Sequence, residues 1–151
     1  MVPVLVATRS ADKLREIRQI AAALPEVRFV TLTDAGIPWS EHEDSLEVFD
    51  TFEENALAKA RYFHRRSGMP VLADDSGLCV DALDGAPGVR TKRFSGRTDL
   101  TGLDLDRANN QHLLDVLAGH PAPRTARYVC AIALVTCDGN EQVFRGTLEG
   151  H

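Results

Sequence analysis

The sequence predicts an α/β fold with a mixed β-sheet, formed by a single domain over residues 1–151. Short apolar runs alternate with longer stretches whose apolar residues recur at helical spacing, a pattern typical of parallel strands joined by helices. The chain then finishes in two apolar strands around a short polar turn, which adds an antiparallel hairpin and makes the sheet mixed. A length of 151 residues suits one domain.

The N-terminal part reads as strand, helix, strand and loop. Residues 2–7 are a short apolar run and predict a buried strand. Residues 11–24 carry Leu and Ile at helical spacing, and Pro25 ends the predicted helix. Residues 27–31 predict the next strand, and the acidic stretch over 33–50 predicts a polar loop.

The second helix has clear signals at both ends. Residues 51–68 predict a helix with Thr51 as its N-cap, and Glu54 three residues later completes the sequence pattern of a capping box. Gly68 is a natural residue for the C-terminal end of this helix.

Two adjacent aspartates interrupt the next apolar segment. A strand is predicted at 70–73, a turn at Asp74–Gly77 and a second strand at 78–83, because Asp, Ser and Gly are common turn residues. The remaining elements are expected to be a helix over 102–119 and hairpin strands over 126–137 and 141–146.

Composition excludes several classes of protein. The formal net charge of −5 and the lack of a basic stripe argue against nucleic acid as a partner. The longest apolar run, over 128–137, is too short to span a bilayer, so no membrane is expected. Three cysteines without zinc-binding spacing predict reduced thiols in the core of a cytoplasmic protein.

The first candidate site is the sequence "ATRSADK" between the first strand and helix. Ser10 can cap the helix, leaving backbone N–H groups and the positive end of the helix dipole near the loop. Thr8 adds a hydroxyl, and Arg9 and Lys13 add positive charge. These features suit phosphate binding, although an ordinary capped helix with surface cations has the same sequence.

The second and third candidates supply acids and another cation. Asp74 and Asp75 suit Mg²⁺, which prefers a few carboxylates, waters and substrate phosphates, but the same residues also suit a simple turn. Lys59 is placed to reach a phosphate or to pair with an acid of the 33–50 loop. Together, the three groups are those needed for metal-assisted attack on a phosphate chain.

At these residues the sequence resembles the inosine-triphosphate pyrophosphatase family. "ATRSADK" resembles the family's T-x-N-x-x-K loop, and "TFEENALAKA" resembles its F-x-E-N-A-x-x-K-A helix. "ADDSGLCVDALDGAPGV" is similar to the block A-D-D-S-G-L-x-V-x-x-L-x-G-x-P-G-V almost residue for residue. This long block makes the resemblance specific.

The resemblance implies Mg²⁺-dependent hydrolysis of noncanonical purine nucleoside triphosphates (XTP, ITP and dITP) to the monophosphate and pyrophosphate. It implies an elongated mixed sheet with flanking helices in two lobes around a central cleft, and a homodimer. Asp75 would be the general base, and the metal site would comprise Glu47, Asp74 and Asp75. The substrate-binding residues would be Thr8, Arg9, Ser10, Ala11, Asp12, Lys13, Lys59 and Ser76.

The sequence also departs from the family pattern. Ser10 stands where the family has Asn, and the Glu-Thr-Gly usually found around the position of Glu47 is absent. The family's Phe-Gly-Tyr-Asp and Ser-His-Arg motifs, which close its nucleobase pocket, do not occur in the 151 residues. We therefore expect an incomplete base pocket, with apolar surface exposed on the hairpin at Ile132, Leu134 and Phe144.

Two alternative functions fit the same sequence. One is a pyrophosphatase for another modified nucleotide, such as a methylated pyrimidine. The other is a catalytically impaired nucleotide-binding protein. A substrate panel distinguishes the first from the favoured function, and pyrophosphate release on addition of ITP and Mg²⁺ distinguishes the second.

Overall fold

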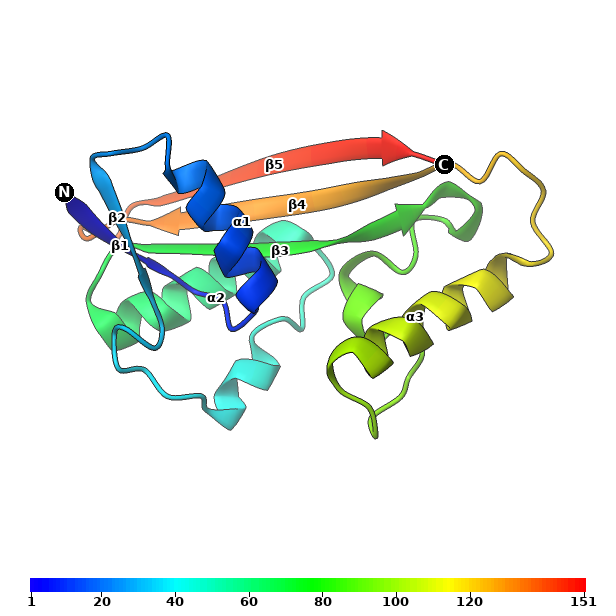
Figure 1. Ribbon diagram of the computed structural model, residues 1–151, viewed down its shortest axis with the longest axis horizontal. Coiled ribbons are helices and arrows are strands. Elements are labelled where there is room, and N and C mark those ends of the chain that lie inside the picture. Colours follow the sequence, from blue (N-terminus) through cyan, green and yellow to red (C-terminus); the bar gives the residue numbers. More distant parts are fainter. The chain divides into compact units, whose positions relative to one another are not determined.

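The computed structural model describes all of residues 1–151, and it confirms a mixed sheet flanked by helices. The strands follow the order β2-β1-β3-β4-β5. Strand β1 is parallel to β2 and β3, whereas β4 and β5 run in opposite directions as a hairpin (Figure 1). The elements in chain order are β1 (Val2–Val6), α1 (Ala11–Ala21), β2 (Val27–Thr31), the 3₁₀ helix η1 (Glu41–Ser45), α2 (Phe52–Ser67), β3 (Val71–Val80), the 3₁₀ helices η2 (Asp81–Leu83) and η3 (Gly88–Arg93), α3 (Gly102–Leu117), β4 (Ala126–Val135) and β5 (Glu141–Gly150).

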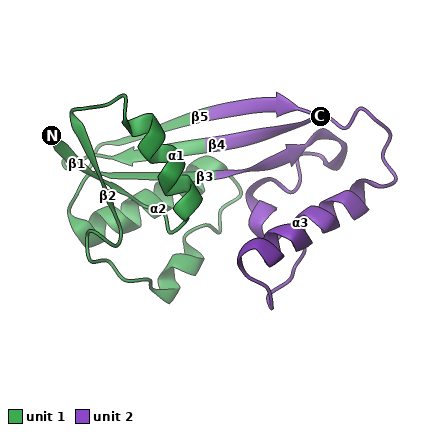
Figure 2. Cartoon of the chain, in the orientation of Figure 1, with its two compact units in different colours: residues 1–75, 131–145 green, residues 76–130, 146–151 purple.

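The chain divides into two compact units, shown in Figure 2. Unit 1 comprises residues 1–75 and 131–145, and unit 2 comprises residues 76–130 and 146–151. None of the helices has the length and apolar character needed to cross a lipid bilayer.

Unit 1 has its core between the sheet and α2. Ala56, Ala60 and Phe63 of α2 are at most 2% exposed, and their i, i+4, i+7 spacing places them on one helix face. Leu5 and Val71 from neighbouring strands are fully buried. Burial of each large apolar side chain contributes about 1.5–3 kcal/mol to the stability of the fold. The packing of these strands against α2 therefore fixes the positions of the side chains at their ends.

The strand order creates a topological switch point in unit 1. The chain passes from β1 to β2 on one side, then returns past β1 to become β3 on the other side. Right-handed crossovers then place α1 and α2 on opposite faces of the sheet, and Figure 1 shows α1 in front of the sheet and α2 behind it. Ligands of open α/β sheets bind beside such a point, at the carboxyl ends of the strands.

Strand β3 corrects the prediction of a turn at Asp74–Gly77. The structure has one continuous strand, Val71–Val80, that passes through all four residues. β1 pairs with β3 only at Val71 and Leu72, so β4, the neighbour of β3 on its other side, is the strand that can satisfy backbone groups of Asp74–Gly77 that a turn would leave without ladder partners. The local turn preference of Asp, Ser and Gly is therefore outweighed by strand pairing.

Helix α2 ends where its sequence predicts. The Thr51 hydroxyl accepts a hydrogen bond from Glu54 N at 3.2 Å, and Gly68 takes a left-handed conformation with φ of 67°. The Glu54 carboxylate accepts a bond from the Thr51 hydroxyl at 2.8 Å. The structure instead forms a full capping box at η1, between Ser40 and Glu43, within the stretch predicted as a polar loop.

Three other predictions need correction. Helix α1 ends at Ala21 rather than residue 24, and tight backbone bonds such as Leu24 N to Ala21 O close its end. All three cysteines are free as predicted, but Cys137 is exposed rather than in the core. On the hairpin, Phe144 is 58% exposed as expected, whereas Ile132 and Leu134 are half-buried.

In unit 2, the buried Asn109 of α3 connects this helix to the segment that follows η3. Its side chain accepts a hydrogen bond from Ser95 N at 2.9 Å and donates one to Lys92 O at 3.0 Å. These bonds hold the η3 segment against α3. Phe94 and His112 add an edge-to-face ring contact with 4.9 Å between centroids.

Candidate functional site

The loop after β1 is fixed by its own hydroxyl groups. The Thr8 hydroxyl accepts a hydrogen bond from Ser10 N at 3.2 Å, and the Ser10 hydroxyl caps α1 by accepting one from Lys13 N at 3.3 Å. Thr8 is 9% exposed. The predicted cap is confirmed, and the N-terminus of the 11-residue α1 lies beside the switch point.

Lys13 reaches from α1 to β3. Its ammonium donates to Asp74 Oδ2 at 2.6 Å, so residues 61 positions apart in the sequence meet at the strand. Burial acts to lower the pKa of Lys13, but the nearby carboxylates of Asp74, Glu47 and Asp75 outweigh it and raise the pKa. Lys13 therefore stays a cation, and it lies close to all three predicted metal-binding acids.

Lys59 forms the second ion pair of the site. It projects from α2, and its ammonium donates to Glu47 Oε1 at 2.5 Å. The Lys59 side chain is only 13% exposed, whereas that of Glu47 is 43% exposed. The helix thus holds the cation in place, and the loop before it supplies the acid.

Asp75 is buried and held by Asn55. The residue is 8% exposed, and its Oδ2 accepts a hydrogen bond from Asn55 Nδ2 at 2.9 Å. Burial raises the pKa of Asp75; Glu47 acts in the same direction, while Asn55, Lys59 and Lys13 act to lower it. The result is a carboxylate that is more basic than usual in a fixed orientation, as a general base requires.

Asn55 also fixes the loop that carries Glu47. Its Oδ1 accepts from Phe49 N at 2.9 Å, and its Nδ2 also donates to Phe49 O at 3.3 Å. Asn55 is fully buried, so this single side chain positions both Asp75 and the 47–51 loop. The motif match identified Asn55, but this bridging contact was not predicted from the sequence.

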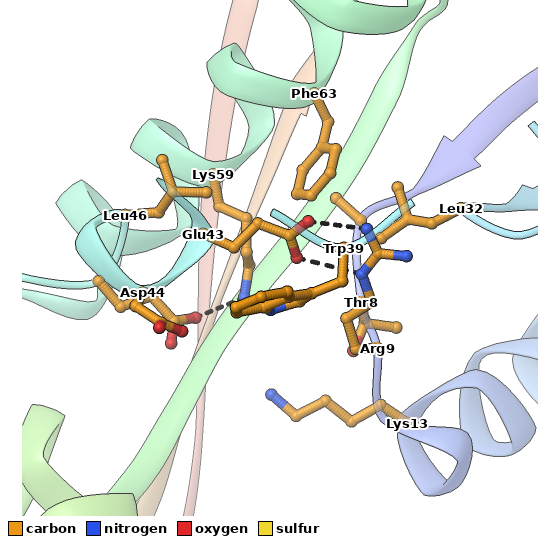
Figure 3. A pocket seen from close by; sticks show the side chains of 12 residues that line it. Thr8, Arg9, Lys13, Leu32, Trp39, Glu43, Asp44, Leu46, Lys59 and Phe63 are labelled. Atoms are coloured by element: carbon orange, nitrogen blue, oxygen red, sulfur yellow. Dashed lines mark hydrogen bonds and ion pairs between the residues drawn. The ribbon is translucent and has the colours of Figure 1, made fainter. Parts of the chain in front are cut away.

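Several of these side chains line a pocket of about 270 Å³ in unit 1 (Figure 3). Of the predicted site residues, Thr8, Arg9, Lys13, Glu47 and Lys59 line it. Asp74 and Asp75 do not line it, but Asp74 forms an ion pair with the lining residue Lys13, and Asp75 lies near enough to Lys13 and Lys59 for both to act on its pKa. The other lining residues are Ala7, Leu32, Trp39, Glu43, Asp44, Leu46 and Phe63.

The remaining predicted substrate residues are placed differently. Ser10 faces the start of its own helix, and Ala11 does not line the pocket. Asp12 is exposed and pairs with Arg15 at 2.8 Å. Ser76 belongs to unit 2.

Arg9 is engaged with the protein rather than left free for a phosphate. It forms a bidentate ion pair with Glu43, with distances of 2.7 and 3.1 Å, and donates to Ile37 O at 3.0 Å. Its guanidinium also lies 6.0 Å from the centroid of the Phe63 ring. Sequence reasoning missed Glu43 and Trp39 as pocket residues; the Ser40–Glu43 capping-box spacing was the available signal for order in this loop.

The acids of the site fit a hard cation that brings other ligands with it. No group of three or more His, Cys, Asp or Glu side chains is arranged as a ready metal-binding set. Asp74, Asp75 and Glu47 nevertheless lie close enough to act on the same Lys13, and all three offer oxygen donors. Mg²⁺ commonly uses one or two carboxylates together with waters and substrate phosphates, so this donor set suits it.

The chain is similar to curated proteins and to solved structures over nearly all of its length. A curated relative from Frankia alni, named dITP/XTP pyrophosphatase, is 47% identical over 149 residues, covering 97% of this chain and 70% of the relative. The solved structure of a nucleoside-triphosphatase, or dITP/XTP pyrophosphatase, from Mycobacterium abscessus is 41% identical with a TM-score of 0.72, covering 99% of this chain and 73% of that one.

A second solved structure extends the comparison. The HAM1 protein from Coxiella burnetii is 33% identical with a TM-score of 0.81, covering 99% of this chain and 72% of that one. The sequence profile of the Ham1 family matches residues 4–151. By both sequence and fold, the chain belongs to the Ham1 family.

Proposed function

We propose that this chain is a nucleoside-triphosphate pyrophosphatase that hydrolyses XTP, ITP or dITP to the monophosphate and pyrophosphate. The observation that carries this proposal is a buried carboxylate, Asp75, held by Asn55 and flanked by the cations Lys13 and Lys59. The names of the relatives from Frankia alni and Mycobacterium abscessus support the same reaction and substrate class.

The protein's own groups suit distinct parts of such a reaction. Lys13 and Lys59, together with the N-terminus of α1, would hold the triphosphate and offset the charge that develops on it. Asp75 would orient the attacking water and accept its proton, because its environment favours the protonated form more than that of an exposed aspartate. Asn55 would keep that carboxylate aimed at the water.

Mg²⁺ is part of the proposal, with Glu47, Asp74 and Asp75 as the residues that would hold it. When bound, it would neutralise phosphate oxygens and polarise the bond that breaks. Lys13 and Lys59 now bind oxygens of Asp74 and Glu47. Substrate phosphates would attract both lysines, and the two carboxylates would then be able to bind the metal ion instead. The homodimer and the cytoplasmic location implied by the family resemblance stay predictions.

The direct test is pyrophosphate release by Asp75→Asn. This substitution keeps the side-chain size and removes the charge, so turnover of ITP should fall by about two to four orders of magnitude. Asp115→Asn, the same substitution on the exposed surface of α3, is the control and should retain full activity. Near wild-type turnover by the folded Asp75→Asn protein would refute the assignment.

The substrate panel should contain XTP, ITP, dITP, GTP and a methylated pyrimidine triphosphate. Preference for the first three supports the proposal, and preference for the pyrimidine identifies a different modified nucleotide. Saturable nucleotide binding without any pyrophosphate release, in the presence of Mg²⁺, would identify a binding protein instead.

A further inference from the structure

Each of the three guanidinium nitrogens of Arg9 donates to the protein. Nε and Nη2 donate to the two carboxylate oxygens of Glu43 at 3.1 and 2.7 Å, and Nη1 donates to Ile37 O at 3.0 Å. Figure 3 shows this ion pair among the side chains that line the pocket. A bidentate arginine–carboxylate pair fixes geometry as well as adding energy, so the contact joins the loop after β1 to η1 in one defined arrangement.

Glu43 passes this contact along η1 toward Glu47. Its side chain is 11% exposed and also accepts a hydrogen bond from Ser40 N at 3.2 Å. Its backbone carbonyl accepts one from Leu46 N at 3.2 Å, and Leu46 is followed directly by Glu47. The residue that Arg9 binds is therefore hydrogen-bonded to the residue that precedes the proposed metal ligand.

The ion pair of Glu47 with Lys59 cannot hold Glu47 during the proposed reaction. Substrate phosphates would draw the Lys59 ammonium away from the carboxylate that it now binds. The hydrogen bonds of Asn55 fix the chain two residues after Glu47, and the Arg9–Glu43 pair fixes the chain before it. Neither of these two attachments uses a group that the proposed phosphate or metal contacts would require.

We propose that Arg9 and Glu43 are positioning residues, whose ion pair holds η1 so that Glu47 stays in place for the metal ion once Lys59 has turned to the substrate. The inference rests on the proposed function, because it takes Glu47 as a metal ligand and Lys59 as a phosphate ligand. A carboxylate that is held beforehand loses less conformational freedom on binding. The pair should therefore act on metal affinity and much less on the chemical step.

The two possible roles of Arg9 predict opposite results for Glu43→Gln. This substitution keeps the side-chain size and removes the charge that holds Arg9. If the pair positions Glu47, the Mg²⁺ concentration for half-maximal ITP hydrolysis should rise about tenfold, with kcat at saturating Mg²⁺ within about threefold of wild type. If Arg9 instead bound phosphate, its release from Glu43 would lower KM for ITP. That result, or an unchanged Mg²⁺ requirement, would overturn the proposal.

A double-mutant cycle tests whether the two residues act as one unit. Arg9→Met keeps the aliphatic stem and removes the guanidinium, and it should raise the Mg²⁺ requirement as much as Glu43→Gln does. Because coupled residues are not additive, the double variant should be no worse than either single variant, and a product of the two effects would overturn the pairing. Glu41→Gln, at an exposed acid of the same 3₁₀ helix, is the matched control and should leave the requirement unchanged.

Amide hydrogen exchange tests the positioning without catalysis. Four backbone N–H groups donate hydrogen bonds within the segment over 40–46, those of Ser40, His42, Glu43 and Leu46. In Arg9→Met, a peptide covering this segment should exchange about tenfold faster in metal-free buffer, while peptides from α2 should exchange as in wild type. Equal exchange over 40–46 in the two proteins would overturn the positioning role.

Metal binding itself can be followed with Mn²⁺, which, like Mg²⁺, suits carboxylate oxygens. The electron paramagnetic resonance signal of the free ion gives the dissociation constant, which should be about tenfold higher for Glu43→Gln than for wild type or Glu41→Gln. Equal constants for the three proteins would overturn the proposal.

These results are distinguishable from a failure of the proposed function. A wild-type chain that neither bound Mn²⁺ nor released pyrophosphate would refute the proposed function, and this inference with it. If the wild-type chain did both, and Glu43→Gln matched it in Mg²⁺ requirement and Mn²⁺ affinity, only the inference about the Arg9–Glu43 pair would be refuted.

Discussion

Replacing Asn55 with alanine should damage stability and catalysis together. The side chain is fully buried and makes hydrogen bonds to Phe49 N, Phe49 O and Asp75. Three lost hydrogen bonds at about 1 kcal/mol each give a destabilisation of about 3 kcal/mol. For a chain of this size, 1 kcal/mol corresponds to about 2–4 °C, so the Tm should fall by about 6–12 °C.

The catalytic loss has a separate cause. Without Asn55, Asp75 loses a partner that fixes its orientation, and the loop bearing Glu47 loses the two hydrogen bonds that join Phe49 to α2, while the Lys59–Glu47 ion pair remains. Loss of such a supporting contact typically lowers activity or metal affinity by 10- to 100-fold. We expect kcat for ITP to fall by about that factor when pyrophosphate release is measured well below the Tm of the variant.

Asn109→Ala provides the matched control. Asn109 is 6% exposed and bonds to the backbone of Ser95 and Lys92 in unit 2. Its loss should lower the Tm comparably while leaving kcat within about threefold. If Asn55→Ala kept its kcat, or if Asn109→Ala lost as much activity, the positioning role of Asn55 would be refuted.

Three further predictions concern charge and backbone conformation. Lys13→Ala should raise KM for ITP, XTP and GTP by similar factors in steady-state assays, because the ammonium faces the proposed phosphate site. An effect on base preference alone would contradict this. Gly68→Ala should cost about 1 kcal/mol in denaturant unfolding, because φ of 67° strains an L-residue although no atom lies within 4 Å of the added Cβ; an unchanged midpoint would contradict it. In metal-free buffer, Asp75→Asn should be more stable than wild type at neutral pH, because burial raises the native pKa of Asp75; the difference should vanish as pH falls below the unfolded value of about 3.9, where the wild-type carboxyl is neutral in both states. A stability difference that is independent of pH would contradict that reasoning.

Local patterns predicted the fold well where the determinants are local. The strand over 27–31 has its predicted bounds, and α2 begins after its Thr51 cap and ends before Gly68. The continuous β3 was not predicted, because pairing with strands distant in the sequence decides its conformation. The missed η1 has a local signal, the Ser40–Glu43 capping box, and a long-range contact, the bond from Arg9 to Glu43 across 34 positions of sequence; only the second could not be read from the sequence.

The candidate site was predictable as a set of residue types, but its pairings were not. The motif match selected Lys13, Lys59, Asp74 and Asp75. In the structure the two lysines line one pocket, Asp74 pairs with Lys13, and both lysines act on the pKa of Asp75. The structure also shows that Arg9 donates a hydrogen bond to Ile37 O in the loop after β2, and that Asn55 connects Asp75 to Phe49. Such assignments depend on which groups meet after folding, and side chains far apart in the sequence give no local sign of it.

The two ion pairs, Lys13 with Asp74 and Lys59 with Glu47, make the binding of anions and cations mutually dependent. An anion that draws the lysines away releases carboxylate oxygens for a cation, and a cation that takes the carboxylates releases the lysines for an anion. The first ligand bears the cost of separating the pairs, and the second does not. By thermodynamic reciprocity each must then raise the affinity for the other by the same factor, so the two should bind far better together than either does alone.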